Sequence, residues 1–454
     1  MGAASLPRRL WWDAFVLWHV RKERHLPFRP LEEILAWQGR RVRAMVEHAY
    51  RHVPFYCVEM RRLGLRPADF RTAADLARLP VVDSRLLADN PEDFRAGDFA
   101  SRPGLEIESS GTSGRSKKIR YDARALFLAL VHGHRQRIVY SAFTGRLFGY
   151  REVDLMRTGG VSTQIRRFYE AHSWIPSRID LKRGTVPPGD ASFPDTVATL
   201  NELRPDVIIS YGSYVGAFLR EVVRAGAKLH HPRLVVYGAD EMAEADRRLI
   251  EAELHIPVIS IYQAAEALRI GFQCELRRGF HLSLDAVAVR VVDERGAEVR
   301  PGGTGHLVIS NLTNRATVLL NYRLGDVVTV GREACPCGRT LPTIEGIRGR
   351  ADDLLRLGDG RMMHGSVALE PLRAAPGVQQ VQIVQRGADR FLLRAVPRPA
   401  ASPTQNTAAL VAAFRARVGQ GVTVDVEWVD AIQPGPNGKV SAVISEILRP
   451  GEDA

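Results

Sequence analysis

The spacing of apolar residues predicts helices at the start of the chain. Between residues 31 and 46 the apolar side chains recur three, four and seven positions apart, which places them on one helix face. They are Leu31, Ile34, Leu35, Val42, Met45 and Val46. Pro54 and Pro67 then interrupt the pattern, as helix breakers do. We therefore expect residues 1–80 to form a mostly helical amino-terminal part.

Beyond residue 116 short runs of β-branched and apolar residues alternate with helix-like segments. The clearest runs are Val207–Ile209, Leu234–Val236 and Val258–Ile261. Strands that alternate with helices are typical of a parallel sheet covered by helices. The expected fold class is therefore α/β, with a large amino-terminal domain of parallel α/β sheets.

After about residue 280 the pattern changes to hairpins. Two strand-like segments, Ala286–Val292 and Gly305–Ser310, follow one another, and Glu294–Gly296 after the first has the composition of a turn. We expect residues 281–345 to form a β-rich subdomain of the large domain.

The last hundred residues restart as a smaller α+β unit. The segments that predict it are strands at 378–385, 391–396 and 422–429, a polar loop at 400–406 and a helix at 408–418. We place the boundary near residue 349. Residues 1–349 would then be the large domain, and residues 350–454 a small, mobile carboxy-terminal lid.

Length and composition fit this division. A chain of 454 residues with 45% hydrophobic content is too long for one core. The longest apolar stretch near the start, residues 10–20, contains Asp13 and His19 and is too short to span a bilayer. It lacks a small-residue cleavage site, so we expect a cytoplasmic protein.

The net charge is +12, and residues 1–75 hold 14 Lys/Arg against 8 Asp/Glu. Such an excess suits nucleic acid or an anionic membrane. Only 6 of the 63 cations are lysine, however, which indicates a general arginine bias, so nucleic acid is not the expected partner. Trp11, Trp12, Phe15 and Trp18 beside basic residues suit an interfacial helix, although packing on the protein's own domain is favoured.

A polar loop after residue 108 is a candidate phosphate site. Its glycines let backbone N–H groups approach phosphate oxygens, its hydroxyls add donors and its cations offset charge. The loop consists of Ser109, Ser110, Gly111, Thr112, Ser113 and Gly114, followed by Arg115, Ser116, Lys117 and Lys118. The composition alone suits a surface linker equally well.

This loop resembles the signature of the adenylate-forming superfamily, and specifically its phenylacetate–CoA ligase and capsule-biosynthesis-type branch. Further motifs resemble that family in the same order along the chain: Tyr237–Asp240, Ile261–Glu266, Tyr322–Asp326, Gly349–Asp353 and Pro436–Val440. Their joint order from residue 109 to 440 is far more specific than any one of them.

The resemblance implies a role for each motif. Gly238, Ala239 and Asp240 would lie beside the adenine, with Asp240 in place of the family's glutamate, and Tyr262 would stack near the base. Glu266 would hold Mg²⁺, Asp326 would bind the ribose hydroxyls, and Arg350 would lie near the ribose or phosphate. Asp352 would be the hinge between the domains. Catalysis would fall to Lys439, Thr112 and Glu266, and Lys117 would join the phosphate loop.

The implied reaction consumes ATP and a small carboxylic acid, and gives an acyl-adenylate and pyrophosphate. The acyl group then passes to CoA, to a carrier-protein thiol or to an amine. Two other functions stay open: transfer of AMP to a hydroxyl of a small molecule, and a non-catalytic scaffold of the same fold. Neither the acid nor the choice between monomer and homodimer follows from the sequence.

The chemistry itself favours two of these residues. Both reactants are anions, so positioning and charge neutralisation supply most of the catalysis. A carboxylate such as Glu266 suits Mg²⁺, and Lys439 is the only lysine after Lys228. Domain closure would carry Lys439 to the site. Taken alone, Asn437–Lys439 suits a hairpin tip instead.

Four cysteines in a chain of this length do not form a disulfide framework. Cys335 and Cys337 are a close pair, and Cys274 and His281 lie upstream in the predicted β-rich region. Three thiolates and an imidazole make a closed tetrahedral zinc site, which would be structural because no position stays open for substrate. Idle or buried thiols are the alternative.

Overall fold

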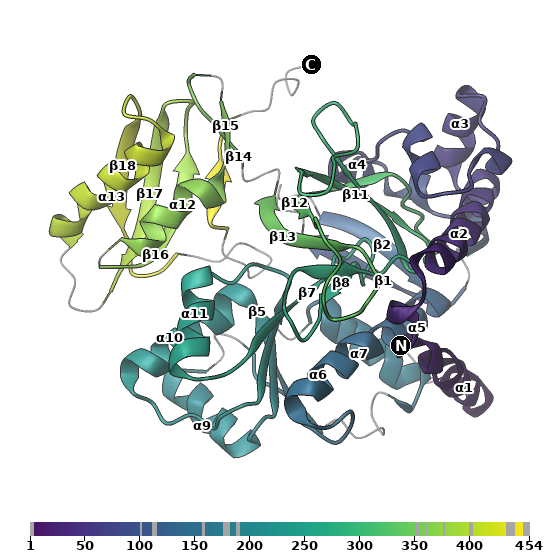
Figure 1. The fold of residues 1–454 in the computed structure, drawn as a ribbon, viewed down its shortest axis with the longest axis horizontal. Helices are drawn as coiled ribbons and strands as arrows, with labels where there is room; N and C mark the ends of the chain where they lie inside the picture. The colour runs from purple at the N-terminus through teal and green to yellow at the C-terminus, as the bar shows by residue number, and fades with distance from the viewer. Residues whose placement is uncertain are drawn as a thin grey trace. The chain divides into compact units, whose positions relative to one another are not determined.

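The structure is a computed structural model. It describes residues 4–99, 102–110, 116–156, 159–175, 182–187, 191–350, 354–359, 361–375, 377–398, 403–432 and 441–447. The chain divides into two compact units (Figure 1). The larger covers most of the chain up to Gly346, and the smaller runs from Ile347 onward and includes residues 325–328.

A parallel sheet forms one half of the larger unit. Its strands are β3 (Arg151–Leu155), β4 (Lys182–Thr185), β5 (Val207–Tyr211), β6 (Leu234–Gly238) and β7 (Val258–Tyr262), in the spatial order β4-β3-β5-β6-β7. All four neighbouring pairs are parallel. The alternating pattern therefore predicted this α/β architecture correctly.

Helices precede or connect these strands and supply much of the core around them. They are α5 (Ala123–His132), α6 (His134–Thr144), α7 (Val161–His172), α9 (Phe193–Leu203), α10 (Gly212–Ala225) and α11 (Glu244–Glu253). Capping explains several boundaries: the carboxylate of Asp122 accepts a hydrogen bond from the backbone N–H of Ala125 at 2.9 Å, and Gly226 ends α10 at φ 60°.

The predicted β-rich segment continues the same sheet. Its strands are β8 (Gly271–Gln273), β9 (Phe280–Leu282), β10 (Val287–Val292), β11 (Thr304–Asn311), β12 (Tyr322–Val330) and β13 (Thr343–Arg350). The direction changes where β7 meets β8 antiparallel, and the full order is β10-β11-β12-β13-β9-β8-β7-β6-β5-β3-β4. The expected hairpin is present, because β10 and β11 pair antiparallel.

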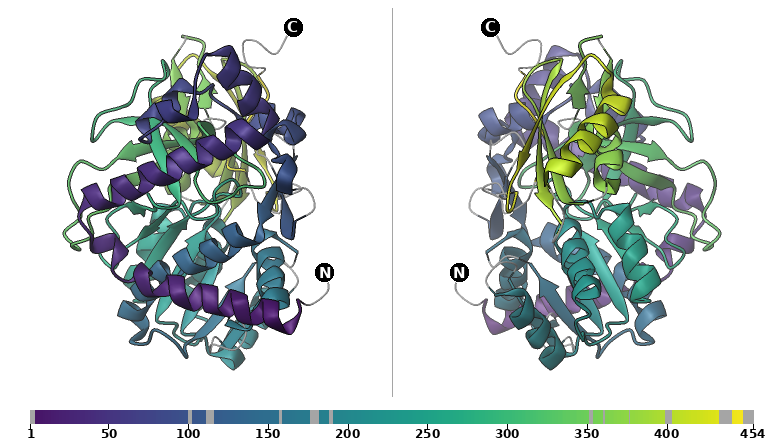
Figure 2. Two further views of the ribbon diagram at one scale, coloured as in Figure 1. Left: turned by 90° about the vertical axis from the view of Figure 1, so that its right-hand side faces the viewer. Right: turned by 90° about the vertical axis from the view of Figure 1, so that its left-hand side faces the viewer.

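The amino-terminal part is helical, as predicted. It contains α1 (Leu6–Glu23), α2 (Leu31–His52), α3 (Pro54–Arg62) and α4 (Ser84–Asp89), with short 3₁₀ turns between them. Pro54 opens α3 and Pro67 opens a 3₁₀ turn, so both prolines interrupt the pattern where expected. α1 and α2, coloured purple, lie on the same side of the larger unit (Figure 2, left).

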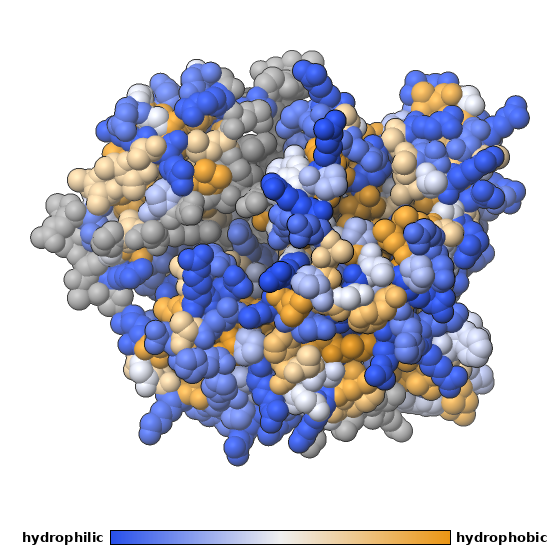
Figure 3. Space-filling view, in the orientation of Figure 1, coloured by the Kyte–Doolittle hydropathy of each residue, from blue (hydrophilic) through white to orange (hydrophobic). Residues whose placement is uncertain are grey.

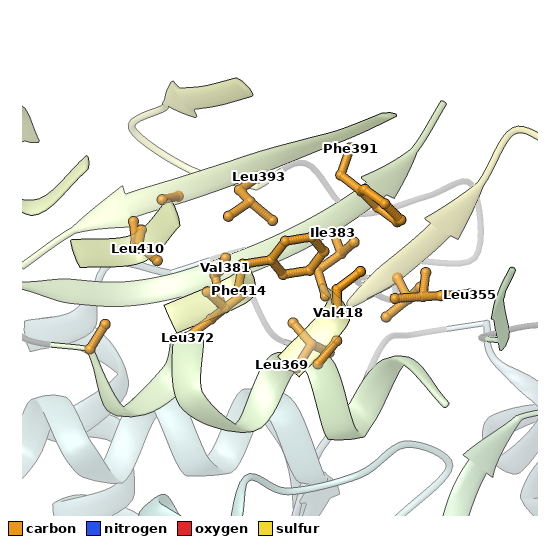
Figure 4. Close-up of a cluster of buried hydrophobic side chains, with 14 of the residues drawn as sticks. Leu355, Leu369, Leu372, Val381, Ile383, Phe391, Leu393, Leu410, Phe414 and Val418 are labelled. Carbon is orange, nitrogen blue, oxygen red and sulfur yellow. The ribbon is translucent and has the colours of Figure 1, made fainter. Parts of the chain in front are cut away.

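The smaller unit packs two helices on a four-stranded sheet. Its elements are β14 (Leu354–Arg356), β15 (Met362–His364), α12 (Gly365–Ala374), β16 (Val378–Gln385), β17 (Arg390–Pro397), α13 (Pro403–Val418), β18 (Thr423–Trp428) and β19 (Val443–Ser445). Phe391, Phe414 and Leu393 meet in its core (Figure 4). The sheet order is β18-β17-β16-β19.

One prediction in this unit is wrong. Residues 400–406 were expected to form a loop, but α13 begins at Pro403. The fixed φ of proline suits the first turn of a helix, where its missing N–H costs nothing, so Pro403 starts the helix instead of preceding it.

No helix within the described residues is long and apolar enough to cross a membrane. In the space-filling view, polar and apolar side chains are mixed over the visible face (Figure 3).

Candidate active site

The carboxyl ends of β5, β6 and β7 form the edge at which ligands bind in open α/β sheets. Gly212 follows β5, Gly238 ends β6 and Tyr262 ends β7. The backbones here approach closely: a Cβ on Gly212 would lie 2.6 Å from the N atom of Met242, and one on Gly238 would lie 2.8 Å from Cγ1 of Ile261. Only glycine fits both positions.

The turn after β6 carries the segment predicted to lie beside the adenine. Ala239 has a left-handed backbone with φ 69°. Asp240 accepts a hydrogen bond from the backbone N–H of Ser213 at 3.2 Å and a second one from its hydroxyl. The side chain of Asp240 thus joins the start of α10 to the end of β6, and Ser213 is a residue that sequence reasoning did not single out.

Tyr262 lies at the end of β7 and is buried, 5% exposed. Its ring centroid is 5.8 Å from that of Phe280 on β9, with the planes tilted by 54°. The ring is therefore fixed at the point where the sheet changes from parallel to antiparallel.

A buried charged cluster lies next to this edge. The ammonium of Lys117 donates to Oε1 of Glu266, and it also donates to the hydroxyl of Tyr322 at 3.2 Å. Tyr322 in turn donates to Oε1 of Glu266 at 3.2 Å. The Lys117 and Glu266 side chains are only 4% and 5% exposed. Three segments distant in sequence thus meet at one carboxylate.

Two further hydrogen bonds fix the loop that carries Glu266. The amide of Asn311 donates to the backbone carbonyl of Glu266 at 2.9 Å, and the hydroxyl of Tyr121 donates to that of Ala265 at 2.7 Å. Burial, and then the charge of Glu266, raise the pKa of Tyr121, so its hydroxyl keeps its proton. The loop is held from two sides.

Strand periodicity explains why Lys117, and not Lys118, enters the cluster. β1 (Gly104–Ser110) and β2 (Ser116–Asp122) pair as an antiparallel hairpin, with Ser110 opposite Ser116. Side chains alternate faces along a strand. Lys117, Ile119 and Tyr121 are therefore buried together, whereas Lys118 is exposed.

Several predicted site residues lie outside this description. Gly111, Thr112, Ser113, Gly114, Asp352 and Lys439 fall outside the described residues, and the side chains of Ser109, Ser110 and Arg350 are not described either. Asp326 lies on β12, four residues after Tyr322, and Arg350 is the last residue of β13. Among the residues predicted to bind the nucleotide or Mg²⁺, Lys117 and Glu266 are in direct contact. Tyr322 was quoted in a motif but not assigned a role.

The four predicted zinc ligands come together in the larger unit. One ligand atom from each of Cys274, His281, Cys335 and Cys337 lies within 4.8 Å of the other three. The sulfurs of Cys274 and Cys335 are 3.7 Å apart, and Sγ of Cys337 lies 3.4 Å from Nε2 of His281. Tetrahedral zinc bonds imply about 3.8 Å for sulfur–sulfur and about 3.5 Å for sulfur–nitrogen edges. These two separations match the edges of such a zinc site.

The surroundings of this Cys/His cluster also suit a metal. Nδ1 of His281 lies 3.3 Å from the carbonyl of Leu341, a contact that leaves Nε2 as the ligand atom. Burial lowers the pKa of His281 to about 4, so the imidazole is neutral at pH 7. Burial also acts on Cys337, but hydrogen bonds from Arg339 outweigh it and the pKa of Cys337 is lowered.

Comparisons with known proteins agree with this architecture. Residues 358–446 match the family model described as the CapK C-terminal domain. The chain is similar to phenylacetate-coenzyme A ligase of Thermus thermophilus, with 30% identity over 340 residues that cover 72% of each chain. The enzyme of the same name from Aromatoleum evansii is 28% identical, with 71% of this chain and 72% of the relative covered.

Solved structures show the same fold. A 2-hydroxyisobutyryl-CoA ligase in the postadenylation state aligns with a TM-score of 0.70 at 20% identity, over 90% of this chain and 89% of the other. An o-succinylbenzoate coenzyme A synthetase of Bacillus subtilis aligns with a TM-score of 0.53 at 13% identity, over 74% and 67%. With two thirds of its length matched to a relative at 30% identity, this chain belongs to the phenylacetate–CoA ligase family of adenylate-forming enzymes.

Proposed function

We propose that the protein is an ATP-dependent acid–CoA ligase that acts through an acyl-adenylate. An oxygen of the acid attacks the α-phosphorus of ATP, the bond to the β-phosphate breaks, and pyrophosphate leaves. The thiol of CoA then attacks the acyl carbon, a thioester forms and AMP leaves. Family membership supports this chemistry, and the observation that carries it is the buried cluster of Lys117, Glu266 and Tyr322 next to the carboxyl edge of the sheet.

Lys117 supplies positive charge on the phosphate side of the site. It lies one residue after Ser116, opposite Ser109, at the end of the β1–β2 hairpin from which the serine- and glycine-rich loop extends. An ammonium held in a buried site interacts with phosphate more strongly than one in water. Its pairing with Glu266 and Tyr322 fixes its position before the nucleotide arrives, which reduces the reorganisation needed during reaction.

Glu266 is the residue we assign to Mg²⁺. A carboxylate oxygen is the hard ligand that this ion prefers, and the ion typically binds through one or two carboxylates together with substrate phosphates. When bound, Mg²⁺ neutralises phosphate charge and orients the leaving pyrophosphate. The hydrogen bonds from Asn311 and Tyr121 to the loop backbone keep the carboxylate in place.

The remaining nucleotide contacts follow the family motifs. We assign Gly238, Ala239, Asp240 and Tyr262 to the adenine, Asp326 and Arg350 to the ribose and α-phosphate, and Thr112 with residues 109–114 to the β- and γ-phosphates. Asp240 also has the structural task of joining β6 to α10 through Ser213. Lys439, on the smaller unit and hinged at Asp352, would neutralise the attacking carboxylate and the α-phosphate together.

The Cys274, His281, Cys335 and Cys337 cluster would hold a structural zinc ion. Its spacing fits tetrahedral coordination, and its four protein ligands leave no position for a substrate. The ion would join β9 and the loop after β8 to the loop before β13, because the ligands come from these segments.

CoA is the acceptor we favour. The four relatives and structures named above are coenzyme A ligases or synthetases of three different acids, and an open form of the 2-hydroxyisobutyryl-CoA ligase was solved with CoA. A carrier-protein thiol, an amine, or AMP transfer to a hydroxyl would each give a different product, so product analysis separates them.

The decisive experiment measures isotope exchange between pyrophosphate and ATP over a panel of aryl, aliphatic and amino acids. Exchange that depends on one class of acid is expected, and addition of CoA should then yield the thioester by mass spectrometry. No exchange with any acid would contradict the proposal. AMP attached to the product would assign the protein to adenylyl transfer instead.

A further inference from the structure

The solvent-facing side of α1 is apolar, which is the reverse of an ordinary surface helix. The described residues contain 14 exposed large apolar side chains, and five of them lie on this one helix. These five define the α1 face: Leu6, Leu10, Trp11, Leu17 and Trp18, each between 48% and 63% exposed. At 100° per residue they fall within one arc of about 140°. An apolar area of this kind marks an interaction surface.

The exposed charges on α1 are all positive. Arg8, Arg21 and Lys22 are exposed, and Arg24 directly follows the helix. The two acidic residues point inward. Asp13 accepts hydrogen bonds from the hydroxyl of Ser173 and the backbone N–H of Trp174, and Glu23 pairs with Arg135 at 2.6 Å. The exposed side chains of the helix are therefore all apolar or cationic.

Packing fixes the direction in which this face points. The opposite side of α1 is buried, and Trp12 stacks on Phe127 of α5 with ring centroids 4.2 Å apart. Together with the inward contacts of Asp13 and Glu23, this stacking prevents the helix from rolling its apolar side onto the protein. The exposure is thus built into the fold.

A basic pocket lies near the carboxyl end of α1, where Lys22 is located. A cavity of about 210 Å³ is lined by four arginines and a tryptophan, namely Arg40, Arg41, Arg124, Arg315 and Trp37. We call it the arginine pocket. The ammonium of Lys22 on α1 lies 6.0 Å from the ring centroid of Trp37, and the guanidinium of Arg41 lies 5.4 Å from it. The α1 face and the pocket are therefore neighbours through Lys22 and Trp37.

The charge in the arginine pocket is not balanced from within. Its lining includes no carboxylate. Burial lowers the pKa of Arg41, and the nearby charges of Arg124 and Arg135 add to the lowering, although Asp285 opposes it. Arginines crowded around one cavity in this way favour an anion with several oxygens, such as a phosphate.

We propose that the α1 face and the arginine pocket together form a docking surface for an anionic phospholipid membrane. The helix lies in the plane of the interface, with its leucines and tryptophans among the headgroups and upper acyl chains. The exposed cations attract the negative surface, and the pocket receives a lipid phosphate. A docked enzyme would meet acids that partition into the membrane.

A protein partner is a less suitable occupant. Tryptophan is the residue preferred at membrane interfaces, and the combination of tryptophan, leucine and arginine on one helix face is that of an interfacial anchor. A second copy of this chain would bring the same cations against one another, so self-association through this face is opposed by charge.

Vesicle flotation of the purified full chain tests the proposal. We expect binding to vesicles of phosphatidylcholine with phosphatidylglycerol and little binding to phosphatidylcholine alone. The Trp11→Ser/Trp18→Ser variant should lose binding at least tenfold. Removing two cations with Arg40→Ala/Arg124→Ala should weaken it about 30-fold, from the contribution of each basic residue near an anionic surface.

Matched variants elsewhere provide the controls. Val58→Ser/Val81→Ser removes two other exposed apolar side chains, and Arg295→Ala/Arg300→Ala removes two exposed cations on the β10–β11 connection. Both should bind vesicles like the parent. Pyrophosphate exchange without vesicles should be unchanged in all four variants, so this test is independent of the proposed ligase activity.

Three outcomes would overturn the proposal. The first is absence of flotation with anionic vesicles, and the second is equal binding by the Trp11→Ser/Trp18→Ser variant. The third is dimerisation in sedimentation that this variant abolishes, which would assign the α1 face to a second copy. If glycerol 3-phosphate in solution binds the arginine pocket while vesicles do not, the pocket serves a free phosphorylated ligand and the membrane assignment is wrong.

Discussion

Lys117 and Glu266 are 149 residues apart in sequence and form a buried ion pair in the larger unit, with Tyr322 donating to the same carboxylate oxygen. An ion pair in this position has two consequences. It fixes the loop end of the β1–β2 hairpin against the loop after β7, and in the proposed function it holds opposite charges ready for a nucleotide and its metal.

The pair predicts that the double variant separates the effect on stability from the effect on activity. Lys117→Met or Glu266→Gln alone leaves one buried group without its partner, which costs about 3–5 kcal/mol, whereas the double variant should regain part of this loss. Pyrophosphate exchange should be lost in all three variants. Thermal unfolding and exchange rates of the two single variants and the double variant measure both effects.

If the double variant exchanged pyrophosphate at the parental rate, the prediction would be contradicted, and the pair would have only a structural role. Lys118→Met is the matched control, because its side chain is the exposed neighbour on the same strand. It should change the unfolding temperature little.

A second prediction concerns the buried cluster behind α1. Arg135 contacts both carboxylate oxygens of Asp285, at 2.8 and 2.7 Å. Burial raises the pKa of Asp285, but Arg135 and then His132 outweigh it, so the pKa is well below its usual range. The ionised Asp285 carboxylate therefore contributes its full stabilisation above about pH 4, and this stabilisation is lost as the pH falls through the lowered pKa of Asp285.

Asp285→Asn should therefore lower the unfolding temperature strongly at pH 7, and the difference from the parent should shrink as the pH falls below about 4. Unfolding temperatures of both proteins across this pH range provide the measurement. A difference independent of pH would show that the carboxylate charge is not responsible. Asp93→Asn, at an exposed position of the 3₁₀ turn Pro91–Phe94, serves as control.

The sequence allowed the fold class and the Cys/His cluster to be predicted, and the limits have physical causes. β-branched runs predicted β5, β6 and β7, because buried parallel strands are nearly all apolar. The grouping of the three cysteines and His281 was predicted from residue type and order. The Lys117–Glu266 contact was not, since it depends on the register of β1 with β2 and on which face of β2 is buried. Neither Ser213 nor Asn311 stands out by type, because hydrogen bonds to a turn backbone carry no sequence signal.

The Cys/His cluster predicts one zinc ion per chain in the purified protein. Cys274→Ser and Cys337→Ser should each reduce the zinc content and lower the unfolding temperature, because ligands from three segments lose their common centre. Cys57→Ser is the control, as Cys57 lies on α3 outside the cluster. Elemental analysis and thermal unfolding of the parent and the variants measure both effects. The assignment would be contradicted if the purified parent held no zinc and the substitutions left its stability unchanged.

Lys439 gives the most direct test of the proposed mechanism. It is the only lysine after Lys228, and the reaction brings two anions together, so the loss of its ammonium removes charge stabilisation from the transition state. Lys439→Ala should reduce acid-dependent pyrophosphate exchange by about 10²–10³-fold, the usual effect of one electrostatic donor. Thioester formation from a supplied acyl-adenylate should be affected much less, because its attacking thiol needs no contact with the α-phosphate. Lys228→Ala, in the segment after α10, should leave both half-reactions unchanged. Equal losses in both half-reactions would show instead that Lys439 serves closure of the smaller unit.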